Sequence, residues 1–141
     1  MTLRIVDASV AVKWFVREEE GKRAAMELLG EIEASPAGFA VPELFFNEML
    51  AVLCRLLEDP AETVDYMNAL QDLGLHRIGN GRELLATAAG LAKNHGVTGY
   101  DAVYAACAKL TGGVWLTADT TAHGRLASTG LSLPLTGVAK G

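Results

Sequence analysis

The sequence is poor in cysteine, with only Cys54 and Cys107 among its 141 residues. Their spacing fits neither a disulfide framework nor a zinc site. Both fall within apolar helical patterns, where a free cysteine typically serves as a small core residue. The lack of paired cysteines favours a reducing compartment, so the cytoplasm is the expected location.

Long hydrophobic runs are also missing. No stretch comes near the roughly 18 consecutive apolar residues that a transmembrane helix needs. At the N-terminus, charged residues such as Arg4 and Asp7 come too early for the apolar core of a signal peptide. We therefore expect no association with a membrane.

Several motifs of nucleotide and phosphate chemistry are absent. The chain has no G-x-x-x-x-G-K-[ST] sequence, which disfavours a P-loop nucleotidase. No G-x-G-x-x-G follows the first predicted strand, which disfavours a dinucleotide enzyme. Asp7-Ala8-Ser9 lacks the second aspartate that an aspartyl-phosphate phosphatase needs two positions further on, for its acid/base step.

Positively charged residues are the minority: the chain has 12 Lys and Arg residues and 17 Asp and Glu residues, for a formal net charge of -5. This balance disfavours binding of nucleic acid by bulk electrostatics. Four carboxylates with unusual surroundings account for most of the excess, and about two divalent cations would nearly neutralise them. A nucleic-acid substrate therefore stays open, provided that its binding is local and metal-dependent.

Half of the residues are hydrophobic, which is enough for one domain over residues 1–141 to form a sizeable core without disulfides or a structural metal. Short apolar strands alternate with helices, the pattern of an α/β domain with a mainly parallel sheet. The predicted strands cover residues 3–6, 39–41, 76–78, 114–117 and 131–133. The predicted helices cover residues 8–16, 22–34, 43–57, 60–73, 80–95, 98–110 and 120–128, with Asn80 as a cap.

The predicted helix at residues 43–57 is apolar around most of its circumference. A helix with so little polar surface is either central to the core or covered by another chain. Its one mid-helix acid, Glu48, is therefore unexpected.

Four acidic residues lie beside apolar sequence, where a charge is costly unless it is paired, hydrogen-bonded or bound to a cation. Asp7 ends the first predicted strand, and Glu48 interrupts the apolar helix. Asp101 lies near the start of a helix of small residues, and Asp119 follows the strand at 114–117. If the fold gathers these residues, a divalent-metal site is the first hypothesis, with a basic partner or protonation as alternatives.

Each of the three aspartates also has a purely structural interpretation. Asp is a preferred N-cap, and the helix dipole stabilises negative charge at that position. Asp101 fits a capping box with Thr98. Taken singly, the aspartates fit a cap as well as a ligand. Glu48 lies in mid-helix, where no cap role exists.

Topology favours the functional interpretation. Asp7 and Asp119 both follow the carboxyl end of a predicted strand, and in open α/β sheets that edge forms the ligand crevice. Oxygen ligands without His or Cys at ligand spacing select Mg²⁺ or Mn²⁺ over zinc. Such ions activate water and stabilise charge on phosphoryl oxygens. The three histidines, His76, His95 and His123, are scattered and are interpreted as ordinary polar residues.

Four sequence blocks, taken together, resemble the PIN-domain family, and within it the VapC-type toxin ribonucleases of bacterial and archaeal toxin–antitoxin pairs. The blocks are Ile5-Val6-Asp7-Ala8-Ser9-Val10, Val41-Pro42-Glu43-Leu44 leading to Glu48 and Leu53, Tyr100 to Ala108, and Leu116-Thr117-Ala118-Asp119. The resemblance covers almost the whole chain and depends on the order and spacing of blocks that are weak singly. It implies a three-layer α/β/α sandwich with a mainly parallel central sheet.

The resemblance also implies the residues of the site. The implied catalytic and metal-binding residues are Asp7, Glu48, Asp101 and Asp119. Ser9 and Thr117 match family positions whose hydroxyls lie near the metal or support its ligands, with capping and strand-end hydrogen bonding as the alternative. Tyr100 and Tyr104, which flank Asp101, are interpreted as packing residues.

Family members typically cleave RNA with Mg²⁺ or Mn²⁺ and are silenced by a VapB-type antitoxin. The resemblance therefore implies an RNA substrate (tRNA, rRNA or mRNA), an antitoxin partner and a homodimer. A homodimer would account for the apolar helix at residues 43–57.

The chain departs from the family just after Asp119. Many members carry a further acidic or polar residue there, whereas this chain reads Thr120-Thr121-Ala122-His123-Gly124-Arg125. One-metal and two-metal mechanisms both stay open. Lys13 and Arg125, on the helices expected to begin at Asp7 and Asp119, are candidates for phosphate contact, with solvated surface charge as the alternative.

The sequence thus favours a metal-dependent endoribonuclease that acts as the toxin of a toxin–antitoxin pair. One alternative is a non-catalytic PIN-like module that binds RNA or protein, against which the four intact acidic positions argue. Another is a metal-dependent nuclease or phosphatase acting on DNA. Contacts to the 2′-hydroxyl would distinguish RNA from DNA, and the sequence does not show them.

Overall fold

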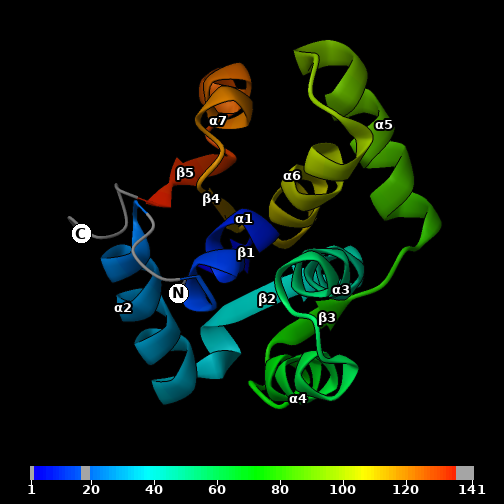
Figure 1. Ribbon diagram of the computed structural model, residues 1–141. Coiled ribbons are helices and arrows are strands. Elements are labelled where there is room, and N and C mark those ends of the chain that lie inside the picture. The colour runs from blue at the N-terminus through cyan, green and yellow to red at the C-terminus, as the bar shows by residue number, and fades with distance from the viewer. Residues whose placement is uncertain (1, 17–19, 136–141) are drawn as a thin grey trace.

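A parallel sheet of five strands runs through the computed structural model, which describes residues 2–16 and 20–135 (Figure 1). The strands are β1 (Arg4–Val6), β2 (Phe39–Pro42), β3 (His76–Ile78), β4 (Val114–Thr117) and β5 (Ser132–Pro134). They lie in the order β3-β2-β1-β4-β5, and every neighbouring pair is parallel. Each predicted strand is confirmed, with ends that shift by one residue at most.

Helices connect the strands. They are α1 (Ala8–Ala11), α2 (Lys22–Ala34), α3 (Leu44–Leu56), α4 (Pro60–Gln71), α5 (Arg82–His95), α6 (Gly99–Thr111) and α7 (Thr120–Leu126). Three 3₁₀ turns, η1 (Val12–Trp14), η2 (Pro36–Gly38) and η3 (Ala127–Thr129), complete the described elements. In the part of the chain that the structure describes, no helix has the length and apolarity to cross a membrane.

The prediction of one continuous helix at residues 8–16 is wrong. The segment forms the short helix α1 and then tightens into the 3₁₀ turn η1. Contacts to α2 explain the change: the Trp14 indole donates to the carbonyl of Ala25 over 2.8 Å, and Lys22 Nζ donates to the carbonyl of Val16 over 2.7 Å. Lys13 therefore lies on the 3₁₀ turn, and not on the helix that begins after Asp7.

The cap prediction for Asn80 is also wrong. The N-cap of α5 is Gly81, and no side chain caps it. The Gly81 amide donates to the carbonyl of Gly79 over 3.0 Å, so Asn80 is the middle residue of a tight turn before the helix.

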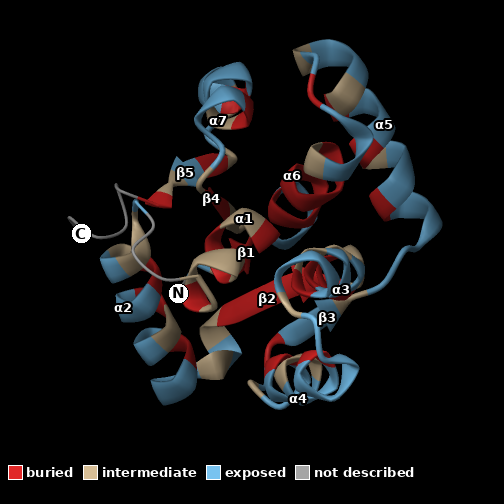
Figure 2. Ribbon diagram, in the orientation of Figure 1, coloured by how far each residue is buried: buried red, intermediate tan, exposed pale blue. Residues whose placement is uncertain are grey.

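Helices cover both faces of the sheet, which gives the predicted three-layer α/β/α sandwich. Helix α6 crosses β1, β2 and β4, and α5 packs against α6. Helix α2 lies on the opposite face from α6 (Figure 1). Figure 2 shows that burial concentrates in β1, β2, β4 and α6, whereas the outer helices α4 and α5 are largely exposed. The centre of the sheet and α6 therefore form the core.

Small side chains let α6 lie close to the sheet. Ala102, Ala105, Ala106, Cys107 and Ala108 are all fully buried. Cys107 is thus confirmed as a core residue. The same prediction is wrong for Cys54, which is exposed because it lies on the outward side of α3.

The connection from α6 to β4 depends on two glycines. Gly112 ends α6 in the left-handed region with φ at 69°, a conformation that glycine adopts without strain at a helix C-terminus. Gly113 passes so close to β1 that an added Cβ would lie 2.3 Å from the carbonyl oxygen of Leu3. Only a residue without a side chain fits there, and the contact fixes where β4 begins.

Candidate active site

The acidic residues surround the point where the connections of the sheet change direction. From β1 the chain proceeds outward through β2 to β3, whereas β4 and β5 lie on the other side of β1. Asp7 follows β1 directly, and its amide donates to the carbonyl of Leu116 in β4 over 3.2 Å. Asp119 follows β4. This is the topological switch point at which open α/β sheets bind ligands.

Two hydroxyl groups hold the Asp7 carboxylate. Its Oδ2 accepts hydrogen bonds from Ser9 Oγ and from Thr117 Oγ1, the latter over 3.1 Å. Asp7 is only 6% exposed, and its side chain makes no capping hydrogen bond to α1 although its backbone occupies the N-cap position. The cap interpretation of Asp7 is therefore wrong, and its carboxylate is held at the carboxyl edge of the sheet.

The same hydroxyls join the ends of β1 and β4. Ser9 Oγ accepts the amide of Ala118 over 3.0 Å, and Thr117 Oγ1 accepts the amide of Asp119 over 3.0 Å. The two hydroxyl oxygens lie 3.4 Å apart. Both strand-end hydrogen bonding and support of an acidic side chain are thus present, so the two interpretations of these residues are compatible.

Glu48 is held by a buried tyrosine. The hydroxyl of Tyr104, on α6, donates to Glu48 Oε1 over 2.7 Å. The Tyr104 ring is 1% exposed, which confirms its packing role. Tyr100 is 66% exposed, so the same interpretation is wrong for it; it lies in the first, outward-facing turn of α6.

The link between Tyr104 and Glu48 is the contact that sequence reasoning missed. A signal was available, because Asp101 and Tyr104 are three residues apart on one helix and so share a face. An acid predicted for the site thus indicated that the tyrosine also points toward it.

Asp101 and Asp119 both serve at helix starts. Thr98 is the N-cap of α6 and accepts the amide of Asp101 over 3.1 Å, as the capping box predicts. Asp119 caps α7, and its Oδ1 accepts the amide of Ala122 over 3.0 Å. The cap interpretation is confirmed for Asp119. A single capping bond leaves its second carboxylate oxygen with further acceptor capacity.

The pKa shifts show that the acids act on one another. Burial raises the pKa of Asp7 to about 6, against the hydrogen bonds from Ser9 and Thr117, with further increases from the charges of Glu48 and Asp101. Burial also raises the pKa of Glu48, the Tyr104 hydrogen bond opposes it, and the Asp101 charge adds to it.

The pKa of Asp101 rises through burial and then through the charge of Asp119, while a hydrogen bond with Thr98 lowers it. All four predicted acids are therefore connected by repulsion in one electrostatic cluster. The pKa of the Tyr104 hydroxyl is raised by burial and by the charges of Asp7 and Glu48, so the hydroxyl stays protonated and acts as a donor.

The cluster is open rather than a closed metal cage. Within residues 2–16 and 20–135, no three His, Cys, Asp or Glu side chains converge closely enough to enclose an ion. Mg²⁺ typically takes one or two carboxylates, keeps several waters and completes its coordination with substrate phosphates. The oxygen donors, their mutual repulsion and the open arrangement fit such an ion.

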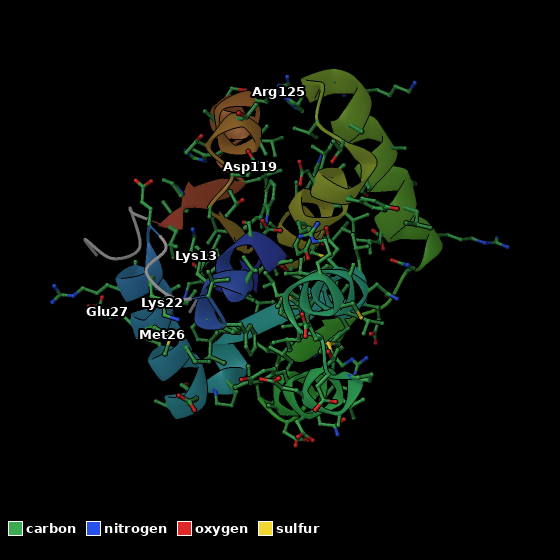
Figure 3. The ribbon with its side chains drawn as sticks, viewed as in Figure 1. Lys13, Lys22, Met26, Glu27, Asp119 and Arg125 are labelled. Carbon is green, nitrogen blue, oxygen red and sulfur yellow. The ribbon has the colours of Figure 1, made fainter. Side chains whose placement is uncertain are left out.

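The two candidate cations differ in position. Lys13 Nζ donates to the carbonyl of Glu20 over 2.7 Å and borders a cavity of about 160 Å³ that Thr117 and Ala118 also line. Arg125 Nη1 donates to the carbonyl of Gly96 over 2.6 Å. Figure 3 shows Asp119 at the start of α7 and Arg125 further along it, on the side that faces α5. Lys13 is thus beside the site, whereas Arg125 ties α7 to the end of α5.

His123 has a structural contact on α7. Its Nδ1 lies 2.7 Å from the hydroxyl of Ser132 in β5. This bond fastens the helix that carries Asp119 to the edge strand of the sheet, in agreement with the interpretation of His123 as an ordinary polar residue.

Comparisons with known proteins agree with this geometry. The PIN domain model matches residues 4–127. No curated protein gives a significant match. A toxin–antitoxin complex from Klebsiella pneumoniae has a chain that is 17% identical with a TM-score of 0.71, the match covering 94% of this chain and 97% of that one.

Two further solved structures share the fold. FitAcB from Neisseria gonorrhoeae is 16% identical with a TM-score of 0.71, covering 95% of this chain and 99% of that one. VapBC-1 from nontypeable Haemophilus influenzae is 10% identical with a TM-score of 0.65, covering 95% and 98%. At such identities the likeness shows the fold, and the family follows from the model that spans most of the sequence. The chain belongs to the PIN-domain family.

Proposed function

We propose that this chain is a metal-dependent endoribonuclease and the toxin of a VapBC-like type II toxin–antitoxin pair. The observation that carries the proposal is the electrostatic cluster of Asp7, Glu48, Asp101 and Asp119 at the switch point. Mutually repelling carboxylates in partly buried positions favour binding of a cation. Structures described as toxin–antitoxin complexes share the fold, which supports the biological role.

Different contacts hold the four acids in place. When bound, Mg²⁺ or Mn²⁺ would supply the activation of water and the neutralisation of phosphate charge. Asp7, fixed by Ser9 and Thr117, and Glu48, fixed by Tyr104, present oxygens whose orientation is set before a ligand arrives. Asp101 and Asp119 lie at the starts of α6 and α7, where they would complete the metal site.

The phosphate backbone of the RNA needs cationic partners in an acidic protein. Lys13 borders a cavity that shares Thr117 with the site, which supports a phosphate contact there. For Arg125 the contact requires exchange of its bond to Gly96 for one to a phosphate oxygen. Because the carboxylates bind the metal and do not read the sugar, contacts to the 2′-hydroxyl decide for RNA over DNA.

The proposed partners follow from charge and exposed apolar surface. A VapB-type antitoxin would satisfy the cluster by placing a basic side chain against the carboxylates. A homodimer would cover α3, where Leu50 and Leu56 are 44% and 49% exposed. All of these interactions would take place in the cytoplasm.

Cleavage of total RNA by purified, antitoxin-free protein tests the function. Reactions contain Mg²⁺, Mn²⁺ or EDTA, with Asp7→Asn as the test variant and Asp65→Asn as the matched control on the exposed side of α4. We expect discrete fragments that need metal, persist with Asp65→Asn and vanish with Asp7→Asn. Absence of cleavage by folded, metal-loaded protein would favour the non-catalytic binding module.

A further inference from the structure

The hydroxyl of Tyr104 lies where three elements of the site meet. The residue belongs to α6, one turn after Asp101, and donates to Glu48 Oε1 on α3 over 2.7 Å. The backbone N–H of Ala8, the residue after Asp7, also interacts with this hydroxyl, and the charge of Asp7 acts on it. One phenol oxygen thus connects the carboxyl end of β1, α3 and α6.

The core fixes the position of that oxygen. The Tyr104 ring stacks on Trp115 of β4, with ring centroids 5.9 Å apart and an interplanar angle of 17°. Both side chains are almost completely buried, at 1% and 0% exposure. A ring that is stacked on a neighbour and almost completely buried has little freedom to change rotamer, so its hydroxyl acts as a fixed donor.

Packing alone does not explain the hydroxyl. Phenylalanine would fill the same space, and a buried hydroxyl is costly unless it is hydrogen-bonded. Glu48 in turn lies in mid-helix, half-buried, with burial and the charge of Asp101 both opposing its ionised form. The hydroxyl and the carboxylate therefore offset each other's cost, and the bond holds one carboxylate oxygen in a set direction.

We propose that Tyr104 is a positioning residue, which holds Glu48 Oε1 so that the second carboxylate oxygen is directed at a divalent cation in the site. This inference rests on the proposed metal-dependent function. Tyr104 acts only through Glu48 and touches neither the ion nor the RNA. Groups that orient a metal ligand in this way typically change metal affinity by about 10- to 100-fold when they are removed.

The test is Mn²⁺ binding to metal-free protein, measured by isothermal titration calorimetry without RNA. The variants are Tyr104→Phe, Glu48→Gln, the double variant, and Tyr66→Phe as the control. Tyr66 is a tyrosine on α4 whose ring packs on Phe15, away from the acidic cluster. We expect Tyr104→Phe to raise the dissociation constant for Mn²⁺ about tenfold, and Tyr66→Phe to leave it unchanged.

The double variant separates positioning from packing. If Tyr104 acts through Glu48, removing its hydroxyl in the Glu48→Gln background should weaken Mn²⁺ binding no further. RNA cleavage by Tyr104→Phe should need a correspondingly higher Mn²⁺ concentration for its half-maximal rate. Thermal unfolding of each variant records any loss of stability separately.

Two results would overturn the inference while the proposed function stands. One is Tyr104→Phe with a lowered melting temperature and the Mn²⁺ affinity of the wild type. The other is an added loss of affinity in the double variant. A wild-type protein that binds no Mn²⁺ would overturn both the proposed function and this inference.

Discussion

Thr117 donates its hydroxyl proton to the Asp7 carboxylate across the junction between β4 and β1, over 3.1 Å. The same oxygen accepts the amide of Asp119 over 3.0 Å, so one side chain holds two acids of the site in register. Thr117 is 1% exposed, so both hydrogen bonds lie in the interior.

Thr117→Val should therefore affect the acidic site more than the packing of the core. Valine keeps the shape of threonine and removes only the hydroxyl. Loss of a buried donor to a carboxylate costs about 1–3 kcal/mol. We expect a lower free energy of unfolding, measured in urea, and weaker binding of Mn²⁺. Thr111→Val on α6, which removes a hydroxyl bonded to the carbonyl of Cys107 outside the acidic cluster, should leave Mn²⁺ binding unchanged.

The raised pKa of Asp7 makes the stability of the metal-free protein depend on pH. Its folded pKa of about 6 lies above its ordinary value of 3.8, so folding favours the protonated acid. The stabilisation from this group is complete below pH 3.8 and is lost as pH rises through about 6. The shift corresponds to about 3 kcal/mol.

The Asp7→Asn variant should lack this contribution to the pH dependence of stability, because asparagine does not ionise. In EDTA, urea unfolding should give the variant and the wild type similar stability near pH 4, and should show the variant to be more stable near pH 7. If the wild type instead gains stability relative to Asp7→Asn as the pH rises from 4 to 7, the surroundings stabilise the ionised Asp7 carboxylate, and the prediction is wrong.

Divalent metal should restore the stability that the repelling acids remove. An ion that binds only the folded protein stabilises it by about 2.7 kcal/mol at 100 times its dissociation constant. We expect Mn²⁺ to raise the melting temperature of the wild type more at pH 7 than at pH 5, because protons compete for the same oxygens. Thermal shifts of equal size in Asp7→Asn would place the bound ion elsewhere.

The close passage of Gly113 by β1 predicts a strong effect of a single methyl group. Gly113→Ala would bring a Cβ within 2.3 Å of the Leu3 carbonyl oxygen, so the strands must shift. Such overpacking costs about 1–3 kcal/mol. Gly90→Ala is the matched control: it lies in α5 with no atom within 4 Å of the added Cβ, and alanine should stabilise the helix by about 0.5–1 kcal/mol. Urea unfolding of both variants measures the contrast.

The strands and the gathering of acids at one sheet edge could be inferred from sequence, because both follow from local patterns. An apolar run that ends in an acid, as at Val6-Asp7, predicts a strand whose carboxyl end bears a polar side chain. Parallel topology then brings such ends together. The cap of Thr98 on Asp101 is likewise a local contact between residues three apart.

What the sequence could not supply depends on contacts between distant residues. Cys54 and Cys107 lie in similar apolar patterns, and only the packing of α3 and α6 makes one exposed and the other buried. The bond from Tyr104 to Glu48 joins residues 56 positions apart, so the helical spacing from Asp101 could indicate the direction of the tyrosine but not its partner. The tightening after α1 likewise depends on Lys22 and Ala25 of another helix.

The stack of Tyr104 on Trp115 has a consequence for how this protein can evolve. The same ring supports the hydrophobic interior and, through its hydroxyl, an acid of the site. Mutations that repack the interior at Trp115 are therefore pleiotropic, since they move the hydroxyl along with the ring. Under the proposed function, substitutions in the interior at this point would be constrained by the metal site, and changes in the metal site would be constrained by the interior.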